Sequence, residues 1–406
     1  MRHLATGAPI GGSPSQVLPF DPDDPRLIDD PYPTYAALRA ESGIHYSPTA
    51  DAWIVTRHAQ VRECLGNWQA FSSTAGVEFS PPIFGPGDPI VNDPPRHDEL
   101  RDLVSRHFHA RSVSALRDPV AARCASILAN RDSWDAVDFV TDFADHIPGA
   151  TMCDILGLPT SDTPWLTGRI HDLLNREQGS TVRERALQAR AELWQYFVDA
   201  MQASWAGGVD SASLIGDLAR AHRGGVISED EVPGLCLSLI VAGTETTTSL
   251  MTTTLFRLMR TDVALGDLMP DGRHVDVRAL DEILRFDSPI QWLTRVTTRD
   301  VTLDGTLIPA GSRVVLCYAS ANRDPEVFSD PDTINVQRGQ SASLAFGFGV
   351  HFCLGRLLSR LEAQIALEAF IARCGVPTPT GDPQRYPSAW LRGFSSLPVS
   401  AAVRQP

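Results

Sequence analysis

The sequence predicts a mainly α-helical protein with a minor β part. Apolar residues recur at helical spacing through most of the middle of the chain. Two turn signals, Asp304-Gly305 and Pro309-Ala310-Gly311, place a small sheet further on. No repeat, linker or change in composition divides the chain, which predicts one domain over residues 19–406 after a flexible tail at 1–18. The segments with helical spacing are Val113–Ala129, Phe139–Leu156, Trp165–Leu174, Arg183–Trp205 and Ser213–Ala221.

The composition is that of an acidic protein without lysine. A formal net charge of −14 argues against general binding to nucleic acids. Because every Lys-or-Arg position is arginine, a cationic docking surface would consist of guanidinium groups. The longest apolar stretch, Leu235–Gly243, is too short to cross a bilayer, and Met1–Gln16 lacks the apolar core of a signal peptide. With 7 scattered cysteines and no Cys-x-x-Cys pair, reduced thiols and a cytoplasmic location are predicted.

The N-terminal part alternates short helices and strands before a long loop. Helices are predicted at Thr34–Glu41 and Arg57–Leu65, with strands at His45–Tyr46 and Trp53–Val55 between them. The stretch from 71 to 93 is rich in proline and glycine. A loop of this length and composition is either functional or a mobile surface segment.

The most informative stretch is Phe346–Gly355, in which one cysteine stands among three glycines. Glycines at 347, 349 and 355 permit a tight turn that aims backbone N–H groups at the sulfur. A helix starting at about Leu354 places its positive end beside Cys353, which favours a thiolate. A rigidly held thiolate suits axial ligation of haem iron. The alternative, a buried structural cysteine, does not account for ten patterned positions.

This stretch resembles the haem-ligand signature of the cytochrome P450 superfamily, Phe-Gly-x-Gly-x-His-x-Cys-x-Gly, with every fixed position present. The resemblance extends from about Pro19 to Val399. It is densest with bacterial members that oxidise small para-substituted aromatics. It implies the cytochrome P450 fold, with haem b between a long distal helix and the helix that follows Cys353, the axial ligand.

Several further residues are expected to hold the haem. His97 and Arg101 lie four apart at a helix start signalled by Asp93-Pro94-Pro95. They resemble the family's His-x-x-x-Arg, which implies binding of a haem propionate. The resemblance gives the same role to Arg295 and His351. The expected cofactor contacts are His97, Arg101, Arg295, His351, Phe346 and Gly347.

A threonine-rich helix is predicted over Glu229–Met259. Thr hydroxyls can bond to a carbonyl in the preceding turn and bend a helix, and Gly243 leaves room for a bound ligand. An acid beside a hydroxyl at that point can relay protons. The run from 242 to 246 resembles the family's Ala/Gly-Gly-x-Asp/Glu-Thr, which implies that Thr246 is the oxygen-activating hydroxyl and Glu245 the proton-relay acid.

Glu282 and Arg285 lie three apart on one helical face. An exposed pair at this spacing contributes little. The Glu-x-x-Arg of the superfamily is buried and structural, and a later arginine completes it. Arg338 stands in that place, although Ile334-Asn335 replaces the usual Phe-Asp.

The reaction implied is monooxygenation: one oxygen atom of O2 enters a substrate, by hydroxylation or oxidative O-demethylation. Electrons are expected from NAD(P)H through a reductase and a ferredoxin. The alternatives are a monooxygenase acting on a terpenoid or macrolide, a peroxide-driven haem-thiolate enzyme, and a haem-based sensor without turnover. A monomer is expected.

The resemblance also marks positions expected to contact a small, aromatic substrate. Relatives that bind benzoates are expected to use arginines where Thr74 and Leu237 stand, so a neutral or phenolic ether fits as well as an acid. The tip of the final hairpin, near Phe394, is expected to reach the pocket. The expected contacts are Phe79, Ile83, Phe84, Ser238, Val241, Ala242, Trp292, Leu293 and Phe394.

An arginine patch is expected near the cysteine. Arg356 and Arg360 share a face of the following helix, and Arg106 and Arg111 follow the propionate helix. In a chain of net charge −14, such a patch would steer an acidic iron–sulfur ferredoxin to the cysteine side.

Overall fold

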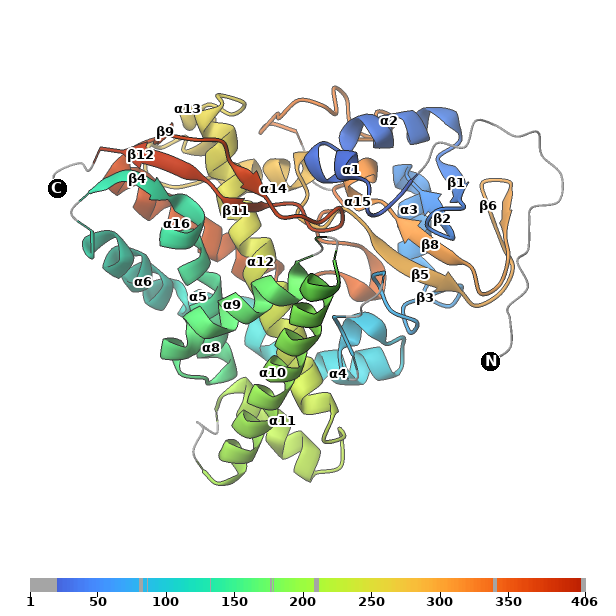
Figure 1. Ribbon diagram of the computed structural model, residues 1–406, viewed down its shortest axis with the longest axis horizontal. Helices are drawn as coiled ribbons and strands as arrows, with labels where there is room; N and C mark the ends of the chain where they lie inside the picture. The colour runs from blue at the N-terminus through green and yellow to red at the C-terminus, as the bar shows by residue number, and fades with distance from the viewer. Residues whose placement is uncertain are drawn as a thin grey trace.

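A computed structural model describes residues 20–79, 83–85, 87–131, 133–175, 177, 179–207, 212–338 and 342–402. Helices dominate these residues, as Figure 1 shows. The predicted tail at 1–18 lies outside the described residues. The α-helices are α1 (Pro25–Asp29), α2 (Tyr32–Glu41), α3 (His58–Gly66), α4 (Arg96–Ser105), α5 (Ala110–Ala115), α6 (Arg117–Ala129), α7 (Phe139–Asp142), α8 (Pro148–Leu156), α9 (Thr163–Leu174), α10 (Ser180–Trp205), α11 (Leu214–Arg223), α12 (Glu231–Met259), α13 (Leu265–Leu268), α14 (Val277–Phe286), α15 (Tyr318–Ala321) and α16 (Arg356–Cys374).

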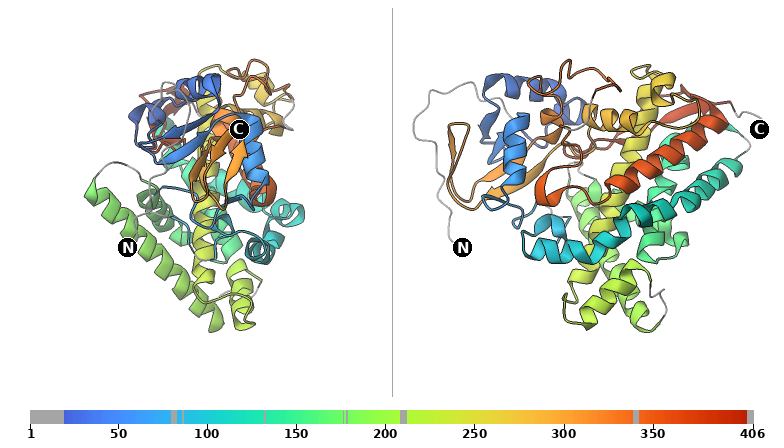
Figure 2. Two further views of the ribbon diagram at one scale, coloured as in Figure 1. Left: turned by 90° about the vertical axis from the view of Figure 1, so that its right-hand side faces the viewer. Right: turned by 180° about the vertical axis from the view of Figure 1, so that it is seen from behind.

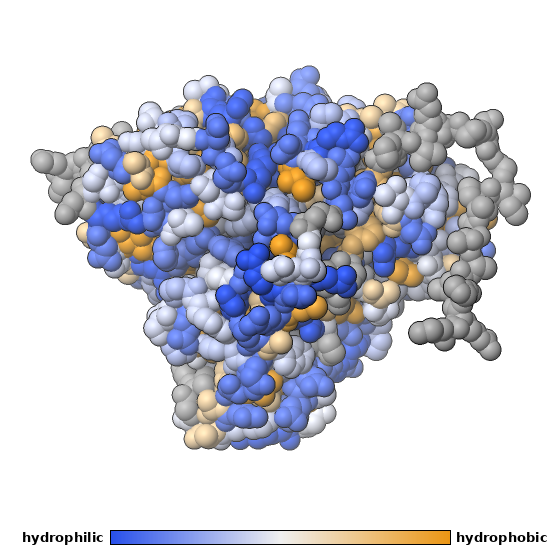
Figure 3. Space-filling model, viewed as in Figure 1, coloured by the Kyte–Doolittle hydropathy of each residue, from blue (hydrophilic) through white to orange (hydrophobic). Residues whose placement is uncertain are grey.

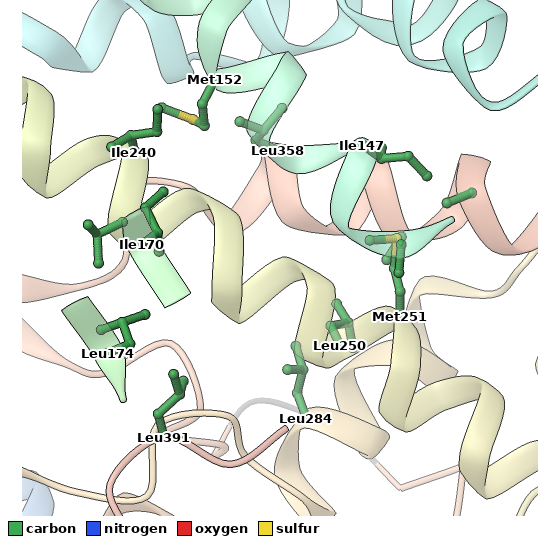
Figure 4. Close-up of a cluster of buried hydrophobic side chains, with 14 of the residues drawn as sticks. Ile147, Met152, Ile170, Leu174, Ile240, Leu250, Met251, Leu284, Leu358 and Leu391 are labelled. Atoms are coloured by element: carbon green, nitrogen blue, oxygen red, sulfur yellow. The ribbon is translucent and has the colours of Figure 1, made fainter. Parts of the chain in front are cut away.

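The long helix α12 runs through the middle of the molecule and packs against α8, α10 and α16 (Figure 1). Most of its side chains are buried, because other helices enclose it on several sides. Its buried threonine hydroxyls can be satisfied by carbonyl oxygens of the preceding turn, as the bond from Thr244 to Ile240 shows. Figure 4 shows Ile240, Leu250 and Met251 of this helix beside apolar residues from its neighbours. The main hydrophobic core is therefore built around α12.

Four small sheets supply the β part of the described residues. The largest has the strand order β1-β2-β8-β5-β3, in which only β2 and β8 pair in parallel. It has a core of its own beneath it, which includes Val61, Phe71 and Leu316. The strands are β1 (Ile44–Ser47), β2 (Ala52–Val55), β3 (Phe71–Ser72), β4 (Trp134–Asp138), β5 (Leu293–Thr297), β6 (Val301–Leu303), β7 (Thr306–Ile308), β8 (Arg313–Leu316), β9 (Thr378–Pro379), β10 (Gln384–Arg385), β11 (Phe394–Ser396) and β12 (Pro398–Ala401).

Two of the predicted helices are each broken into two. The segment 113–129 divides at Leu116 into α5 and α6, and 139–156 divides into α7 and α8 around a 3-10 turn, η3 (Ala144–His146). Pro119 and Pro148 lie in the first turns of α6 and α8. A proline is tolerated there but not in a helix interior, because it lacks the N–H and clashes with the preceding turn. The other 3-10 turns are η1 (Pro89–Val91), η2 (Arg106–Phe108), η4 (Thr160–Asp162) and η5 (Gly349–His351).

The helix α16, which follows the cysteine, lies alongside α6, as the right-hand view of Figure 2 shows. It begins at Arg356, two residues later than predicted. Hydrophilic residues cover most of the face in Figure 3, with small scattered apolar areas. Within the described residues, none of the helices combines the length and the hydropathy needed to span a bilayer.

Candidate active site

The cysteine loop is held by backbone hydrogen bonds and by close packing. The Cys353 amide donates to the Phe346 carbonyl oxygen at 2.9 Å. Gly349 has φ +74°, and a Cβ there would lie 2.6 Å from the carbonyl oxygen of Leu65 in α3. Only glycine permits both the left-handed backbone and this approach. The sequence pattern of the loop thus reflects a turn pressed against α3.

Cys353 differs from the other six cysteines, which are all buried. Cys353 is exposed because it lines an internal cavity. The rest of the loop is packed against other parts of the protein. Burial raises the pKa of the Cys353 thiol, whereas the amides of Gly355 and Arg356 and the charge of Arg101 oppose that rise. These groups would stabilise a thiolate once a cation shares the site.

The cavity has a volume of about 280 Å³. The cysteine loop forms one part of its wall, and Ala242, Gly243 and Thr246 of α12 form another. Much of the remaining wall is apolar. It includes Phe84, Ile90, Leu239, Val241, Leu293, Trp390 and Leu391.

Four basic side chains from three parts of the chain meet in this wall: His97 and Arg101 of α4, Arg295 of β5 and His351. The rings of His97 and His351 lie edge to face with centroids 4.7 Å apart, and the buried Nε2 of His97 has no hydrogen-bond partner among the described residues. Arg101 donates to the carbonyl oxygen of Phe352 at 2.6 Å. Burial lowers the pKa of His351 to about 3, with the charges of Arg295, His97 and Arg101 adding to the effect.

This arrangement fits haem. Although Asp98 pairs with Nδ1 of His97 at 2.7 Å, the four basic groups outnumber this one acid and favour an anionic ligand. The unpartnered His97 Nε2 adds a hydrogen-bonding position for that ligand. The two carboxylates of the porphyrin would supply both the negative charge and a hydrogen-bond partner for His97. Phe346 and Gly347 also line the cavity, beside the thiol that would reach the iron.

Comparison with known proteins agrees with this fit. The cytochrome P450 family model matches residues 277–403. The chain is 32% identical over 380 residues to cytochrome P450 109 of Bacillus spizizenii, covering 91% of each chain. It is 32% identical over 396 residues to the vitamin D(3) 25-hydroxylase of Pseudonocardia autotrophica, covering 92% of this chain and 94% of that enzyme.

The chain belongs to the cytochrome P450 family. The structure of CYP109E1 from Bacillus megaterium in complex with testosterone matches with a TM-score of 0.82 and 27% identity, over 93% of this chain and 98% of that one. The predicted fold class is therefore confirmed.

As a P450, the protein is a monooxygenase that uses haem b, O2 and electrons derived from NAD(P)H through redox partners. The haem iron, when bound, supplies the reductive activation of O2. The contribution of the chain is to hold the cofactor and to shape a cavity beside it.

Thr246 faces the cavity of this P450 from α12. Its hydroxyl donates to the carbonyl oxygen of Ala242 at 2.7 Å, and Thr254 makes the same bond to Leu250 at 2.7 Å. A Cβ on Gly243 would lie 2.8 Å from the sulfur of Met152 in α8. The side chain that glycine lacks would project toward α8, which corrects the expectation that Gly243 makes room for the ligand.

Glu245, beside Thr246, is buried in a cluster of ionisable groups that we call the distal cluster: Glu245, His171 of α9, Asp145 of η3 and Tyr386. His171 Nε2 lies 3.0 Å from Glu245 Oε1 and 3.6 Å from Asp145 Oδ2. Burial alone would lower the pKa of His171, but Glu245 and Asp145 raise it to about 9. The imidazolium side chain is 35% exposed, so this cluster connects Glu245 with solvent.

The predicted Glu-x-x-Arg pair forms a second buried group, the Glu282 cluster, with Arg338. Arg285 donates to both carboxylate oxygens of Glu282 at 2.8 Å, and Arg338 Nε donates to Oε1 at 3.1 Å. The remaining donors of Arg285 reach the carbonyl oxygens of Asn322, Pro331 and Thr333. The geometry is therefore that of the structural ion pair the resemblance implied.

Five of the nine expected substrate contacts lie in the cavity wall: Phe84, Ser238, Val241, Ala242 and Leu293.

The other four lie outside this wall and have other packing partners. Phe79 and Trp292 stack edge to face at 5.3 Å, Ile83 is buried in the main core, and Phe394 packs against Phe256.

Thr74 and Leu237, the positions considered for carboxylate recognition, also lie outside the wall of this cavity. Thr74 is bonded to Ser72 at 2.8 Å, and Leu237 belongs to the core.

The sequence did not predict four residues that the structure places at or near the site: His171, Asp145, Tyr386 and Asp88. The first three meet Glu245 from distant parts of the chain, so no local pattern announces them. Asp88 lies within the proline-rich loop and lines the cavity. Asp88 stands between apolar and proline residues in this loop, which is a local signal for a buried acid.

Proposed function

We propose that Cys353 is the axial thiolate of the haem and that His97, Arg101, Arg295 and His351 bind its propionates. The observation that carries this proposal is the cavity with the Cys353 thiol at one wall and Thr246 at another. Phe346 and Gly347, in the same wall, would contact the porphyrin. In this arrangement Thr246 and Glu245 deliver protons to reduced dioxygen.

The Cys353→Ser variant tests the ligand. Its ferrous–CO complex should lose the strongly red-shifted absorption band, because an alcohol or water donates less electron density than a thiolate. Cys374→Ser, at the far end of the same helix, is the matched control and should keep the band. Retention of the band in Cys353→Ser would overturn the assignment.

We propose that the substrate is a small, apolar, aromatic molecule that undergoes hydroxylation or oxidative O-demethylation. The apolar wall formed by Phe84, Val241 and Leu293 supports an apolar substrate. A terpenoid or macrolide is the second candidate, favoured by a vitamin D(3) hydroxylase and a testosterone complex among similar proteins. A panel of aromatic acids, phenols and terpenes, scored by the low-to-high-spin shift of the ferric Soret band, separates these classes.

We propose a ferredoxin as the immediate electron donor, docking on the cysteine side of a monomer. Arg360 is bound to Asp281 by hydrogen bonds of 2.7 and 2.6 Å, and Arg106 pairs with Asp217. These two arginines are therefore removed from the expected patch. Within the described residues, Arg111 and Arg356 have no acidic partner, and Arg62 lies 4.2 Å from the centre of the Phe348 ring, beside the cysteine loop.

Arg356→Glu should slow the first electron transfer without altering the substrate spin shift. In the wild type, this rate should fall as ionic strength rises, because salt screens the attraction to an acidic ferredoxin. A rate indifferent both to salt and to the charge reversal would rule out the patch.

A further inference from the structure

The carboxyl group of Asp88 is an unpaired acid in the wall of the cavity. Asp88 is 1% exposed. Its Oδ1 accepts the Ile90 amide at 2.9 Å, which caps the short turn η1. Its Oδ2 is buried and has no hydrogen-bond partner among the described residues. Buried carboxylate oxygens are normally bonded, so capping explains one oxygen and leaves the other without a role.

Close packing fixes the position of this carboxyl group. Gly87 has φ +84°, and a Cβ there would lie 2.3 Å from the carbonyl oxygen of Glu231, at the start of α12. The Asn92 side chain donates to the Asp88 carbonyl oxygen at 2.8 Å. Two turns further along α12, Ser238 lines the cavity together with Asp88. The Asp88 carboxyl group is therefore held in a rigid part of the wall, with the Ser238 hydroxyl close to it.

The charges around Asp88 do not neutralise it. Burial raises its pKa to about 7, and the charge of Glu78 adds to the rise, whereas the Ser238 hydroxyl and the Ile90 amide oppose it. Glu231 is paired with Arg96, and Arg190 of α10 donates to the carbonyl oxygen of Ile83. Arg101 and Arg295, the cations of the wall, donate to Phe352 and Thr294. What this carboxylate lacks is a cation.

We propose that Asp88 binds a protonated amine carried by an otherwise apolar substrate. This proposal rests on the proposed function, since the amine would belong to the molecule that is oxidised in the same cavity. An ammonium N–H would occupy the free Oδ2 and supply the missing positive charge, while the substrate body contacts apolar wall residues such as Ile90 and Leu239.

An amine accounts for this site better than other polar groups do. A substrate carboxylate would be repelled by Asp88 and by the neighbouring charge of Glu78. A hydroxyl group could fill one hydrogen-bonding position but would leave the buried charge uncompensated. Asp88 is therefore expected to select for charge, which an alcohol cannot imitate.

A matched pair of probes tests this selection on the haem-loaded enzyme. The first is an N,N-dimethyl phenylbutylamine, chosen because a crowded tertiary nitrogen ligates iron poorly. The second is the hydrocarbon in which CH replaces its nitrogen. Dissociation constants are measured by calorimetry and by the Soret shift. Asp88→Asn should weaken binding of the amine by roughly 10- to 100-fold and that of the hydrocarbon by less than about threefold.

Asp276→Asn is the matched control, because Asp276 caps α14 through the Arg278 amide in the same way but lies outside the cavity wall. It should change neither dissociation constant. An equal loss for both probes in Asp88→Asn would overturn the proposal. So would an alcohol analogue that depends on Asp88 as strongly as the amine does, since the site would then recognise a hydrogen-bond donor.

The wild-type enzyme provides a second test that does not require the variant to fold. Between about pH 8 and about pH 6, amine affinity should fall as Asp88 becomes protonated, while hydrocarbon affinity stays constant. Parallel pH profiles would contradict the proposal. The ferrous–CO band of the same samples reports the haem site independently, so a failure of the amine site and a failure of the proposed function are distinguishable.

Discussion

The Glu282 cluster and the distal cluster are both buried groups of charges, but they differ in how completely their polar atoms are paired. Both oxygens of Glu282 and the donors of Arg285 are bonded to neighbours. In the distal cluster, neither oxygen of Glu245 receives a well-aligned hydrogen bond from the described residues, and Asp145 Oδ1 and the Tyr386 hydroxyl also lack one.

This difference separates a structural role from a chemical one. A fully paired buried network holds a shape and gains nothing from a further partner. A buried network with spare donors and acceptors is stable only if something else completes it, such as water or a passing proton. The distal cluster adjoins Thr246 and reaches solvent through His171, so we expect it to change state during turnover while the Glu282 cluster does not.

The largest expected effect is on stability. Glu282→Gln leaves two arginines beside a neutral side chain, and removing one partner of a buried pair typically costs about 3–5 kcal/mol of unfolding free energy. Glu99→Gln is the control, because Glu99 forms an exposed pair with Arg96 three residues away and should contribute less than about 1 kcal/mol. Denaturant unfolding of both variants measures the difference. A loss near the control value would mean that the Glu282 cluster is not structural.

The next effect is on coupling. Thr246→Ala should keep haem and substrate binding but lower the product formed per NADPH by about tenfold or more, with peroxide released instead, because the relay loses its hydroxyl. Thr254→Ala removes an identically bonded hydroxyl from the same helix, outside the cavity wall, and should stay coupled. Product and peroxide yields measure both. Unchanged coupling in Thr246→Ala would place the relay elsewhere.

The smallest effect concerns pH. His171 has its pKa raised in the folded state to about 9 from 6.5, so its stabilising contribution is complete below pH 6.5 and is lost as the pH rises through about 9. His171→Gln should remove this part of the pH dependence of unfolding. His274→Gln is the control: Asp271 also raises the pKa of His274, but this pair is exposed and screened by solvent, so the profile should change much less. Identical pH profiles of unfolding for the wild type and His171→Gln would mean that His171 is not stabilised by the acids of the distal cluster.

The comparison also explains what the sequence could predict. The Glu282 cluster begins with two residues three apart on one helix, and the cysteine loop occupies ten consecutive residues, so their local spacing was informative. The distal cluster is assembled from α9, η3 and a segment near the C-terminus, and such contacts leave no local pattern.

Two other misplacements have the same physical origin. The packing partner of Gly243 is Met152, on a different helix, so the side of α12 that needed a glycine could not be known from α12 alone. Phe394 packs onto Phe256 of α12 and lies outside the cavity wall. The helix breaks near Pro119 and Pro148, in contrast, could have been predicted from the prolines themselves. The sequence interpretation gave more weight to the helical spacing of apolar residues and placed one helix across each proline.

Asp281 and Glu282 are neighbours on α14, and each forms an ion pair with a different part of the chain. Asp281 holds Arg360 of the helix that follows the cysteine, while Glu282 holds Arg338. The Asp281–Arg360 pair ties α16 to α14, and the Glu282–Arg338 pair ties the segment before the cysteine loop to the same helix. A braced frame around Cys353 moves little when an electron arrives, so the reorganisation energy of electron transfer should be small. The temperature dependence of the first reduction rate would then be shallow, and loosening the Asp281–Arg360 clamp would steepen it.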